Sequence, residues 1–398
     1  MVERSGSSSR VFFSGLNELR AIAALMVLVH HVELYKHRAG DPSLFKTWLR
    51  VFIAHAGKNG VYIFFVLSGF LITYLLLEEK HRTGTISLKK FYLRRAYRIW
   101  PLYYLIVVIS FFILPVLAWN IGALQAEHHY FGRIELLTSS SQNFLQPLGL
   151  FLLFLPNLAI KWFPAVVGAA QTWSVGVEEQ FYLLWPVLIK HAKKKLLPLM
   201  LIALSLLPIV VDASHFISPG LPGRLSWWLS VLPINFMACG GIGAYLYFFH
   251  RDKIERLFTN SWLFGLNSLV LLASLFMTLN PLYFAIISTT TILFIIQESF
   301  RYNLRCKWLD NAGTISYGIY MYHPTIMFLS FAVINSLALV EADSALYHVA
   351  AYLVIVPATL AVSRLSYHGW EKKFIRIKNQ KHTVIESGKP VDGSNPKS

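Results

Sequence analysis

Charge is scarce in this chain: only 14% of its 398 residues are Asp, Glu, Lys or Arg, whereas 55% are hydrophobic. That composition is too apolar for a soluble domain of this length, and many windows of about 20 residues carry no charge at all. Only two cysteines are present, Cys239 and Cys306, so the sequence predicts neither a disulfide framework nor a metal site. The composition excludes a soluble globular protein and predicts an all-α polytopic membrane protein.

Acidic residues are fewer than basic ones, 20 against 36, which gives a formal net charge of +16. A basic excess of this size can bind nucleic acid, but here the Lys and Arg residues lie between apolar spans. The excess of Lys and Arg in cytoplasmic loops, which sets the orientation of a membrane protein, explains that pattern better, so no nucleic-acid partner is expected. A cleavable signal peptide is also not expected, because the N-terminal segment is polar and no small-residue cleavage site follows the first apolar span.

Ten apolar segments predict transmembrane helices. They are 15–35, 57–77, 99–119, 177–190, 196–211, 229–249, 260–279, 282–298, 315–337 and 347–366. A further segment, 148–160, is short and flanked by prolines. If it does not cross, 28 of the 36 Lys and Arg lie on the cytoplasmic side, whereas crossing would invert every later loop. We therefore expect about ten spans, both termini in the cytoplasm, and a re-entrant or interfacial segment near 148–160.

A single integral-membrane domain over 1–375 is expected, followed by a polar cytoplasmic tail over 376–398 that is disordered. A transporter is the main alternative of another class, because ten spans with buried charges suit it as well. No internal repeat is evident, which counts against that alternative. A lipid-binding structural protein would explain the basic loops but not the titratable residues inside the spans.

Arg20 and His31 lie in the first span. Eleven steps of about 100° bring them to one helix face, about 16 Å apart along the axis. An ionisable residue at membrane depth is costly and by default a functional candidate, and histidine can take and return a proton near neutral pH. His31 could instead be a structural residue that donates to a backbone carbonyl, but at membrane depth we favour function. His30 is turned about 100° away and is expected to be structural.

Three arginines, Arg94, Arg95 and Arg98, lie at the cytoplasmic entrance of the third span. One helical turn presents all three guanidiniums, and their forked geometry suits phosphates better than lysine does. Backbone N–H groups at the start of a helix also favour anions. A stop-transfer cluster bound to lipid headgroups explains the composition equally well.

Ser174, Glu178 and Tyr182 recur at intervals of four residues where the fourth span begins, so they share a helix face. We interpret them as pocket residues. Glu179 is expected to be solvated and to complement the helix dipole. Later in the chain, Ser316, Tyr317, His323 and Glu371 are further pocket candidates. His323 precedes Pro324 and either faces the same cavity or only caps backbone groups that the proline frees.

Six segments in this order resemble the membrane acyltransferase-3 family, and together they cover about residues 12–375. They are Arg20-x10-His31, 60–72 (GVYIFFVLSGFLI), 91–101 (FYLRRAYRIWP), 173–182 (WSVGVEEQFY), 316–324 (SYGIYMYHP) and 367–374 (YHGWEKKF). Tyr62 departs from the family pattern, which usually has an acidic residue there, so no acid is expected to act at that position. The resemblance is to the stand-alone form, without a fused hydrolase domain.

The resemblance implies transfer of an acyl group, usually acetyl from acetyl-CoA, to a hydroxyl of a cell-surface or lipid-linked glycan, or alternatively of a small metabolite or lipid. It places the protein in the bacterial cytoplasmic (inner) membrane, in contact with lipid. His31 would be the general base or a transient acyl carrier, and Glu178 would orient it. The CoA phosphates would lie on the arginine cluster, while Arg20 would hold a phosphate or polarise the thioester oxygen. No metal is required.

Overall fold

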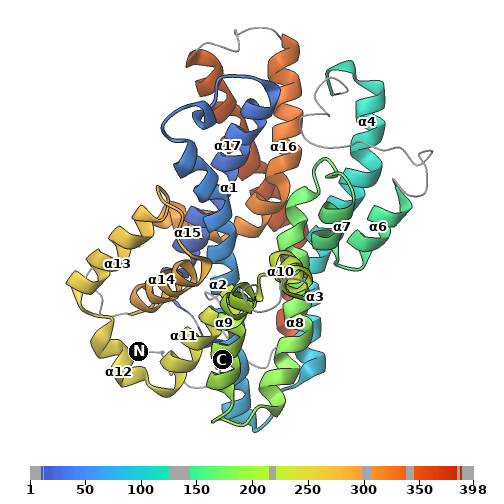
Figure 1. The fold of residues 1–398 in the computed structure, drawn as a ribbon. Coiled ribbons are helices and arrows are strands. Elements are labelled where there is room, and N and C mark those ends of the chain that lie inside the picture. The colour runs from blue at the N-terminus through green and yellow to red at the C-terminus, as the bar shows by residue number, and fades with distance from the viewer. Residues whose placement is uncertain are drawn as a thin grey trace.

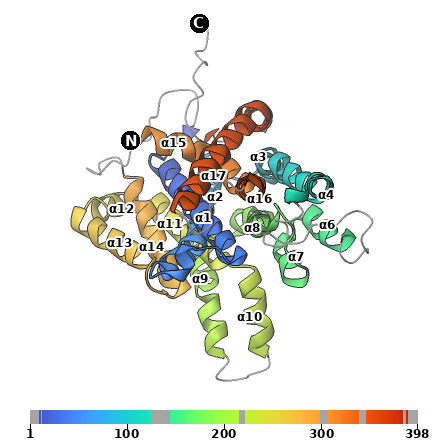
Figure 2. The ribbon, with the colours of Figure 1, turned by 90° about the horizontal axis from the view of Figure 1, so that it is seen from above.

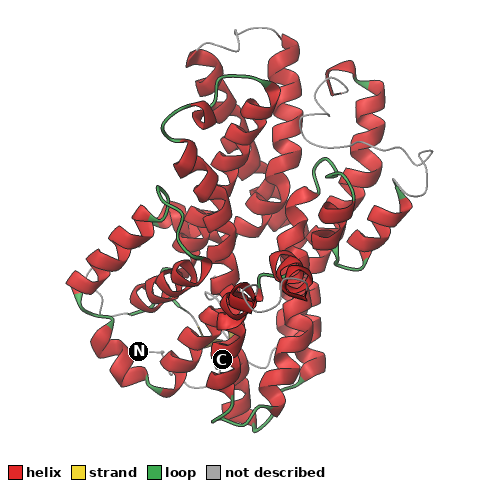
Figure 3. Ribbon diagram, viewed as in Figure 1, coloured by secondary structure: helices red, strands yellow, loops and turns green. Residues whose placement is uncertain are grey.

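The computed structural model describes residues 10–11, 13–124, 144–214, 221–297, 306–337, 345–382 and 386–387. Within these ranges the regular structure is helical apart from two strands of two residues each (Figure 3). The strands β1 (Arg10–Val11) and β2 (Glu386–Ser387) pair in parallel, so segments near the two ends of the chain lie side by side. The all-α class predicted from composition is confirmed.

Eleven of the helices belong to the ten expected spans or continue them. They are α1 (Leu16–Ala39), α2 (Arg50–Thr83), α3 (Leu88–Val108) with α4 (Leu114–Asn120), α8 (Trp173–His191), α9 (Leu197–Ser214), α11 (Ile234–Phe249), α13 (Ser261–Ala273), α14 (Pro281–Ile295), α16 (Ser316–Leu337) and α17 (Ala345–Ser366). The others are η1 (Leu44–Lys46), η2 (Ile109–Ile113), α6 (Leu145–Leu152), α7 (Pro156–Trp162), η3 (Ala170–Thr172), α10 (Leu221–Val231), α12 (Arg251–Leu257), α15 (Lys307–Thr314), η4 (Tyr367–Glu371) and α18 (Lys372–His382).

The helices α1, α2 and α16 lie near the middle of the bundle (Figures 1 and 2). Seen from above, α12, α13 and α14 lie on one side, while α3, α4, α6 and α7 lie on the other. The pair α9 and α10 projects from the bundle. Segments far apart in the sequence therefore meet at its centre, where α2 contacts α1, α8, α11 and α14.

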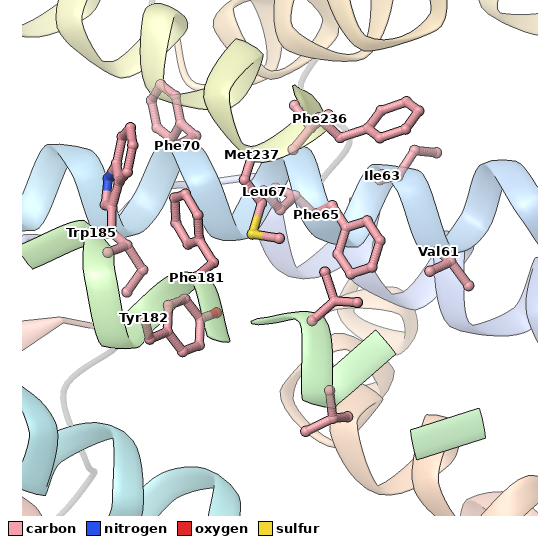
Figure 4. Close-up of a cluster of buried hydrophobic side chains, with 14 of the residues drawn as sticks. Val61, Ile63, Phe65, Leu67, Phe70, Phe181, Tyr182, Trp185, Phe236 and Met237 are labelled. Atoms are coloured by element: carbon pink, nitrogen blue, oxygen red, sulfur yellow. The ribbon is translucent and has the colours of Figure 1, made fainter. Parts of the chain in front are cut away.

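Small residues allow α2 and α11 to approach closely. A side chain at Gly69 would meet the Met237 backbone, and one at Gly240 would meet the Val66 carbonyl oxygen. Close backbone approach at small residues is a usual packing device between membrane helices, where lipid supplies no hydrophobic drive for association. Figure 4 shows the resulting core, in which apolar side chains from α2, α8 and α11 gather, among them Phe65, Phe181 and Phe236.

Two neighbouring apolar helices begin at an asparagine cap. The Asn260 side chain accepts hydrogen bonds from Trp262 N and Leu263 N at the start of α13, and Asn280 accepts from Leu282 N at the start of α14. These bonds satisfy backbone donors that a helix start leaves unpaired. Two long helices instead continue through a π-helical turn, η2 after α3 and η4 after α17. Such turns occur mostly as single insertions within α-helices, often at functional sites.

Among the described residues, four helices are long and apolar enough to cross a membrane by length and composition. They are Arg50–Thr83, Leu88–Asn120, Ser316–Ser336 and Leu346–Asn379. Four shorter apolar helices accompany them, Leu197–Val211, Ile234–Phe249, Ser261–Ala273 and Pro281–Ile295. Helix α1 is long enough but carries five charged residues, which lowers its apolar character.

Segment 148–160 forms two short helices, α6 and α7, around a break where Phe154 has a positive φ of 57°. The structure departs from the sequence predictions at two places. Helix α10 was not among the expected spans. The tail expected to be disordered from 376 is helical through His382, because α18 continues from η4 and packs on α3. The remainder of the tail, apart from β2, lies outside the described residues.

Candidate functional site

A cavity of about 120 Å³ lies inside the bundle. Its lining includes eight of the twelve residues predicted from the sequence: Arg20, Arg95, Arg98, Ser174, Glu178, Tyr182, Ser316 and Tyr317. The cavity is therefore assembled by α1, α3, α8 and α16, together with α2, which contributes Phe64 and Ser68.

Positive charge dominates this cavity. Arg20, Arg95 and Arg98 line it, against a single carboxylate, Glu178. The Nε of Arg95 is buried and makes no hydrogen bond to a described residue, although its guanidinium lies over the Tyr182 ring, 5.8 Å from the centroid. A buried N–H group without a partner is costly. These guanidiniums can therefore accept an anionic or strongly polar ligand within the cavity.

Glu178 is held by two hydroxyls. Its Oε1 accepts from Ser68 Oγ at 2.6 Å, and its Oε2 accepts from the Tyr182 hydroxyl at 3.1 Å. The four-residue spacing thus brings Ser174, Glu178 and Tyr182 to one face, as predicted. The expected contact between Glu178 and His31 is absent from the described hydrogen bonds, in which His31 contacts Val27 O and His323 instead.

Arg94 does not line the cavity with its two neighbours. Its Nη2 lies 2.9 Å from Oε2 of Glu79, and this carboxylate also accepts from Ser87 N at 2.8 Å. The Glu79 side chain is only 3% exposed. The predicted cluster of three donor-binding arginines is therefore divided: Arg95 and Arg98 face the cavity, and Arg94 pairs with an acid near the end of α2.

His31 lies outside the cavity lining and pairs with His323 of α16. The two ring centroids are 4.9 Å apart, and His31 Nδ1 lies 3.3 Å from His323 Nε2. His31 Nδ1 also contacts the Val27 carbonyl oxygen at 2.8 Å. His30 instead contacts the Ile53 carbonyl oxygen at 2.9 Å, which agrees with the structural role expected for it.

The histidine pair lies close to one end of the cavity. Along α16 the lining residues run from Ser316 to Tyr320, and His323 follows three residues later, about 4.5 Å further along the axis. The Tyr320 and His323 rings are 5.8 Å apart. Arg98 lies near the opposite end, because the hydroxyl of Tyr317, at the start of α16, donates to the carbonyl oxygen of the adjacent Ile99 at 3.0 Å. The site is thus ordered, with guanidiniums toward one side and imidazoles toward the other.

Glu371 also lies outside the cavity lining. It is buried in the π-helical turn η4, where its Oε1 accepts from Ser366 Oγ at 3.3 Å, and Ser366 in turn accepts from the Tyr322 hydroxyl at 2.9 Å. It interacts electrostatically with Arg98. Glu371 is therefore linked to the cavity through its interaction with Arg98.

Three features of the site were missed in the sequence. Ser68 and Tyr320 line the cavity, and Tyr320 exchanges a hydrogen bond with Ser174 at 2.8 Å. Both residues fall inside segments already singled out, and a polar residue inside an apolar helix was the available signal. Glu179, expected to be solvated, instead accepts a hydrogen bond from Trp100 Nε1 at 3.0 Å and keeps one buried oxygen without a described partner.

The apolar helices and this interior cavity define an integral membrane protein with an arginine-rich site. The chain belongs to the acyltransferase-3 family, since the profile of that family's acyltransferase domain matches residues 13–368.

Several curated relatives support the same assignment. The chain is 25% identical to the peptidoglycan O-acetyltransferase OatA of Listeria monocytogenes over 362 residues, which is 84% of this chain and 52% of the relative. It is 26% identical to the O-acetyltransferase OatA of Staphylococcus aureus over 353 residues, 80% of this chain and 51% of the relative. A putative O-acetyltransferase of Staphylococcus aureus strain COL is 30% identical over 184 residues, 45% of this chain and 25% of the relative. The chain thus spans about half of these relatives' length or less. No solved structure matches it.

Proposed function

We propose that this protein is a membrane O-acetyltransferase that moves an acetyl group from acetyl-CoA, bound from the cytoplasmic side, to a hydroxyl of a cell-surface glycan. The observation that carries the proposal is the convergence of Arg20, Arg95 and Arg98 on one cavity. A thioester donor with a polyphosphate chain needs fixed positive charge along its path, and arginine supplies it with directional donors. The family and its O-acetyltransferase relatives give the reaction class.

The proposed topology has about ten spans, with both termini in the cytoplasm of a bacterial cell and the protein in the cytoplasmic membrane. The parallel pairing of β1 with β2 supports a common side for the two ends. Helices α6 and α7 have eight and seven residues, too few to cross a hydrocarbon core of about 30 Å at about 1.5 Å per residue. Segment 148–160 is accordingly proposed to be re-entrant or interfacial.

In this scheme the donor enters where α3 begins. Arg95 and Arg98 bind phosphate oxygens, and Arg20, deeper along α1, binds a further phosphate or polarises the thioester oxygen. The acetyl thioester of the donor is proposed to lie in this cavity. Glu178 keeps Tyr182 and Ser68 in place and balances one of the positive charges.

The chemistry then requires a base on the acceptor side of the thioester. His31 takes the proton of the acceptor hydroxyl, and the oxygen attacks the thioester carbonyl carbon. The carbon–sulfur bond breaks, CoA leaves as a thiolate, and the His31 imidazolium returns the proton to sulfur. The products are an O-acetyl ester and CoA-SH.

The decisive experiment uses proteoliposomes that contain the purified protein. Radiolabelled acetyl-CoA is supplied on one face, and soluble peptidoglycan fragments are supplied on the other. We expect base-labile label on the glycan only when acetyl-CoA is on the face that bears the loop between α2 and α3. Solute accumulation without ester formation would favour a transporter, and ester on a lipid or small hydroxyl compound alone would replace the glycan as acceptor.

Two matched variants control this assay. His31→Ala should reduce transfer by about 10²- to 10⁴-fold, the usual contribution of general base catalysis. His30→Ala, on the neighbouring residue, should cost much less because its ring faces Ile53. An inactive His30→Ala beside an active His31→Ala would refute the assignment of the base.

A further inference from the structure

The contact between His31 and His323 joins two helices that are far apart in the sequence. Helices α1 and α16 pack against each other, and their rings meet at 3.3 Å between His31 Nδ1 and His323 Nε2. His323 is 1% exposed. A polar contact between two imidazoles at this depth requires one ring to donate and the other to accept.

The carbonyl contacts decide which nitrogen donates. A carbonyl oxygen only accepts, so His31 Nδ1, 2.8 Å from Val27 O, carries a proton. By the same argument His323 Nδ1, 3.3 Å from Ile319 O, carries one too. His323 Nε2 is then the unprotonated nitrogen of a neutral ring. It accepts the His31 Nδ1–H, which is shared with Val27.

The remaining nitrogen is His31 Nε2. In the neutral ring it bears a lone pair, and it makes no hydrogen bond to a described residue. A general base needs this arrangement: one nitrogen fixed as a donor and the other left free to take a proton. When Nε2 takes that proton, His323 Nε2 still accepts from Nδ1–H and stabilises the imidazolium.

We propose that His323 is the positioning residue of His31: it fixes the Nδ1–H tautomer and the ring orientation, and so performs the task expected of Glu178 from the sequence. This inference rests on the proposed function, since it takes His31 as the base. The alternative expected from the sequence is that His323 only caps backbone carbonyl groups of α16. Such a cap would need no contact with α1, whereas His323 contacts His31.

The test compares His323→Ala with His323→Gln in the native chain in lipid nanodiscs, with acetyl-CoA and soluble peptidoglycan fragments as substrates. The amide oxygen of glutamine can occupy the place of Nε2 and accept the same hydrogen bond. We expect His323→Ala to lower kcat by about 10- to 100-fold, which is at most the lower limit of what general base catalysis contributes because the base itself is retained, with the KM for acetyl-CoA unchanged. His323→Gln should recover most of kcat. His30→Gln, beside the pair, should leave kcat close to that of the native protein.

The outcomes separate this proposal from the proposed function. If His31→Ala is inactive while His323→Ala keeps the native kcat, the positioning role is overturned and the acyl transfer stands. Equal losses in His323→Ala and His323→Gln, each folded by size-exclusion chromatography, would also overturn it, because hydrogen-bond acceptance would not be what matters. If His323→Ala fails to fold, the kcat of His323→Gln against that of His30→Gln decides alone. Absence of transfer by the native protein would instead refute the proposed function.

Discussion

Arg94 and Arg98 are one helical turn apart, yet Arg98 lines the cavity and Arg94 pairs with Glu79. Replacing each arginine in turn with glutamine should therefore have different effects on donor binding and on stability. A hydrogen bond to a charged group contributes about 1.5–3 kcal/mol. Arg98→Gln should therefore raise the Kd of acetyl-CoA by about 10- to 140-fold at about 1.4 kcal/mol per factor of ten. The thermal midpoint should fall less than in Arg94→Gln, because loss of the attraction between Arg98 and Glu371 is offset by relief of the repulsion between Arg98 and the guanidiniums of Arg20 and Arg95.

Arg94→Gln should behave in the opposite way. It removes the partner of Glu79, whose side chain is 3% exposed, and breaking a buried pair from one side costs about 3–5 kcal/mol. The hydrogen bond from Ser87 N remains, so we expect the lower end of that range. The thermal midpoint should fall by several degrees, while the Kd of acetyl-CoA should change less than about threefold.

The assay is calorimetric titration of acetyl-CoA into each variant in nanodiscs, alongside thermal unfolding followed by tryptophan fluorescence. Dephospho-CoA serves as a second ligand, because its weaker dependence on Arg98 would identify the missing phosphate as that residue's partner. Equal losses of acetyl-CoA affinity in both variants would contradict the division of the cluster. An unchanged affinity for acetyl-CoA in Arg98→Gln would instead favour the interpretation that these arginines bind lipid headgroups.

Three further results are expected. Gly240→Ala should lower the thermal midpoint, because the new Cβ would meet the Val66 carbonyl oxygen, whereas Gly265→Ala, which has open space, should be neutral or slightly stabilising in the same unfolding assay. Glu178→Gln should lower kcat for acetyl transfer by about tenfold, since it keeps one acceptor oxygen for Tyr182 or Ser68 but removes the carboxylate that faces the guanidiniums; a native kcat would show that its charge is dispensable. A cysteine at Lys195, in a background without Cys306, should react with an impermeant maleimide only from the cytoplasmic side, and labelling from outside would overturn the assignment of every later loop.

Much of the architecture could be predicted from the sequence because apolar length is a local property. Each of the ten expected spans contains a helix, and most boundaries agree within about five residues, but α2 extends beyond 57–77 at both ends and α3 begins at Leu88, well before residue 99. The faces shared by Ser174, Glu178 and Tyr182 were also predictable, since helical periodicity fixes them within one element. Segment 221–231 was missed because it is less apolar than its neighbours.

The side chains that Arg94 and His31 contact could not be predicted from the sequence, because those contacts depend on which helices pack against each other. The pattern of three arginines on one turn gives no sign that Glu79, on the preceding helix, takes Arg94. Likewise, Glu178 was a reasonable partner for His31, since a carboxylate commonly orients a catalytic imidazole. The actual contact comes from His323, 292 residues away in the chain. A carboxylate that is expected to orient a catalytic imidazole need not lie beside it in the folded protein.

The order of groups along the bundle explains why Arg20 and His31 can lie on one helix face and still belong to different parts of the site. Arg20 lies within electrostatic range of Arg95, Arg98 and Glu178, whereas His31, about 16 Å further along α1, lies beyond the cavity lining with His323. A carrier such as CoA is long, with its charge concentrated at the nucleotide end and its reactive carbonyl at the other. Because Arg20 and the proposed base His31 are separated by this distance, α1 can bind the phosphates of the donor and also place the base near the thioester carbonyl. Three adjacent positive charges beside His31 would instead disfavour the imidazolium that forms during transfer. Tyr320 lines the cavity and its ring contacts His323, so it lies between the guanidiniums and the histidine pair.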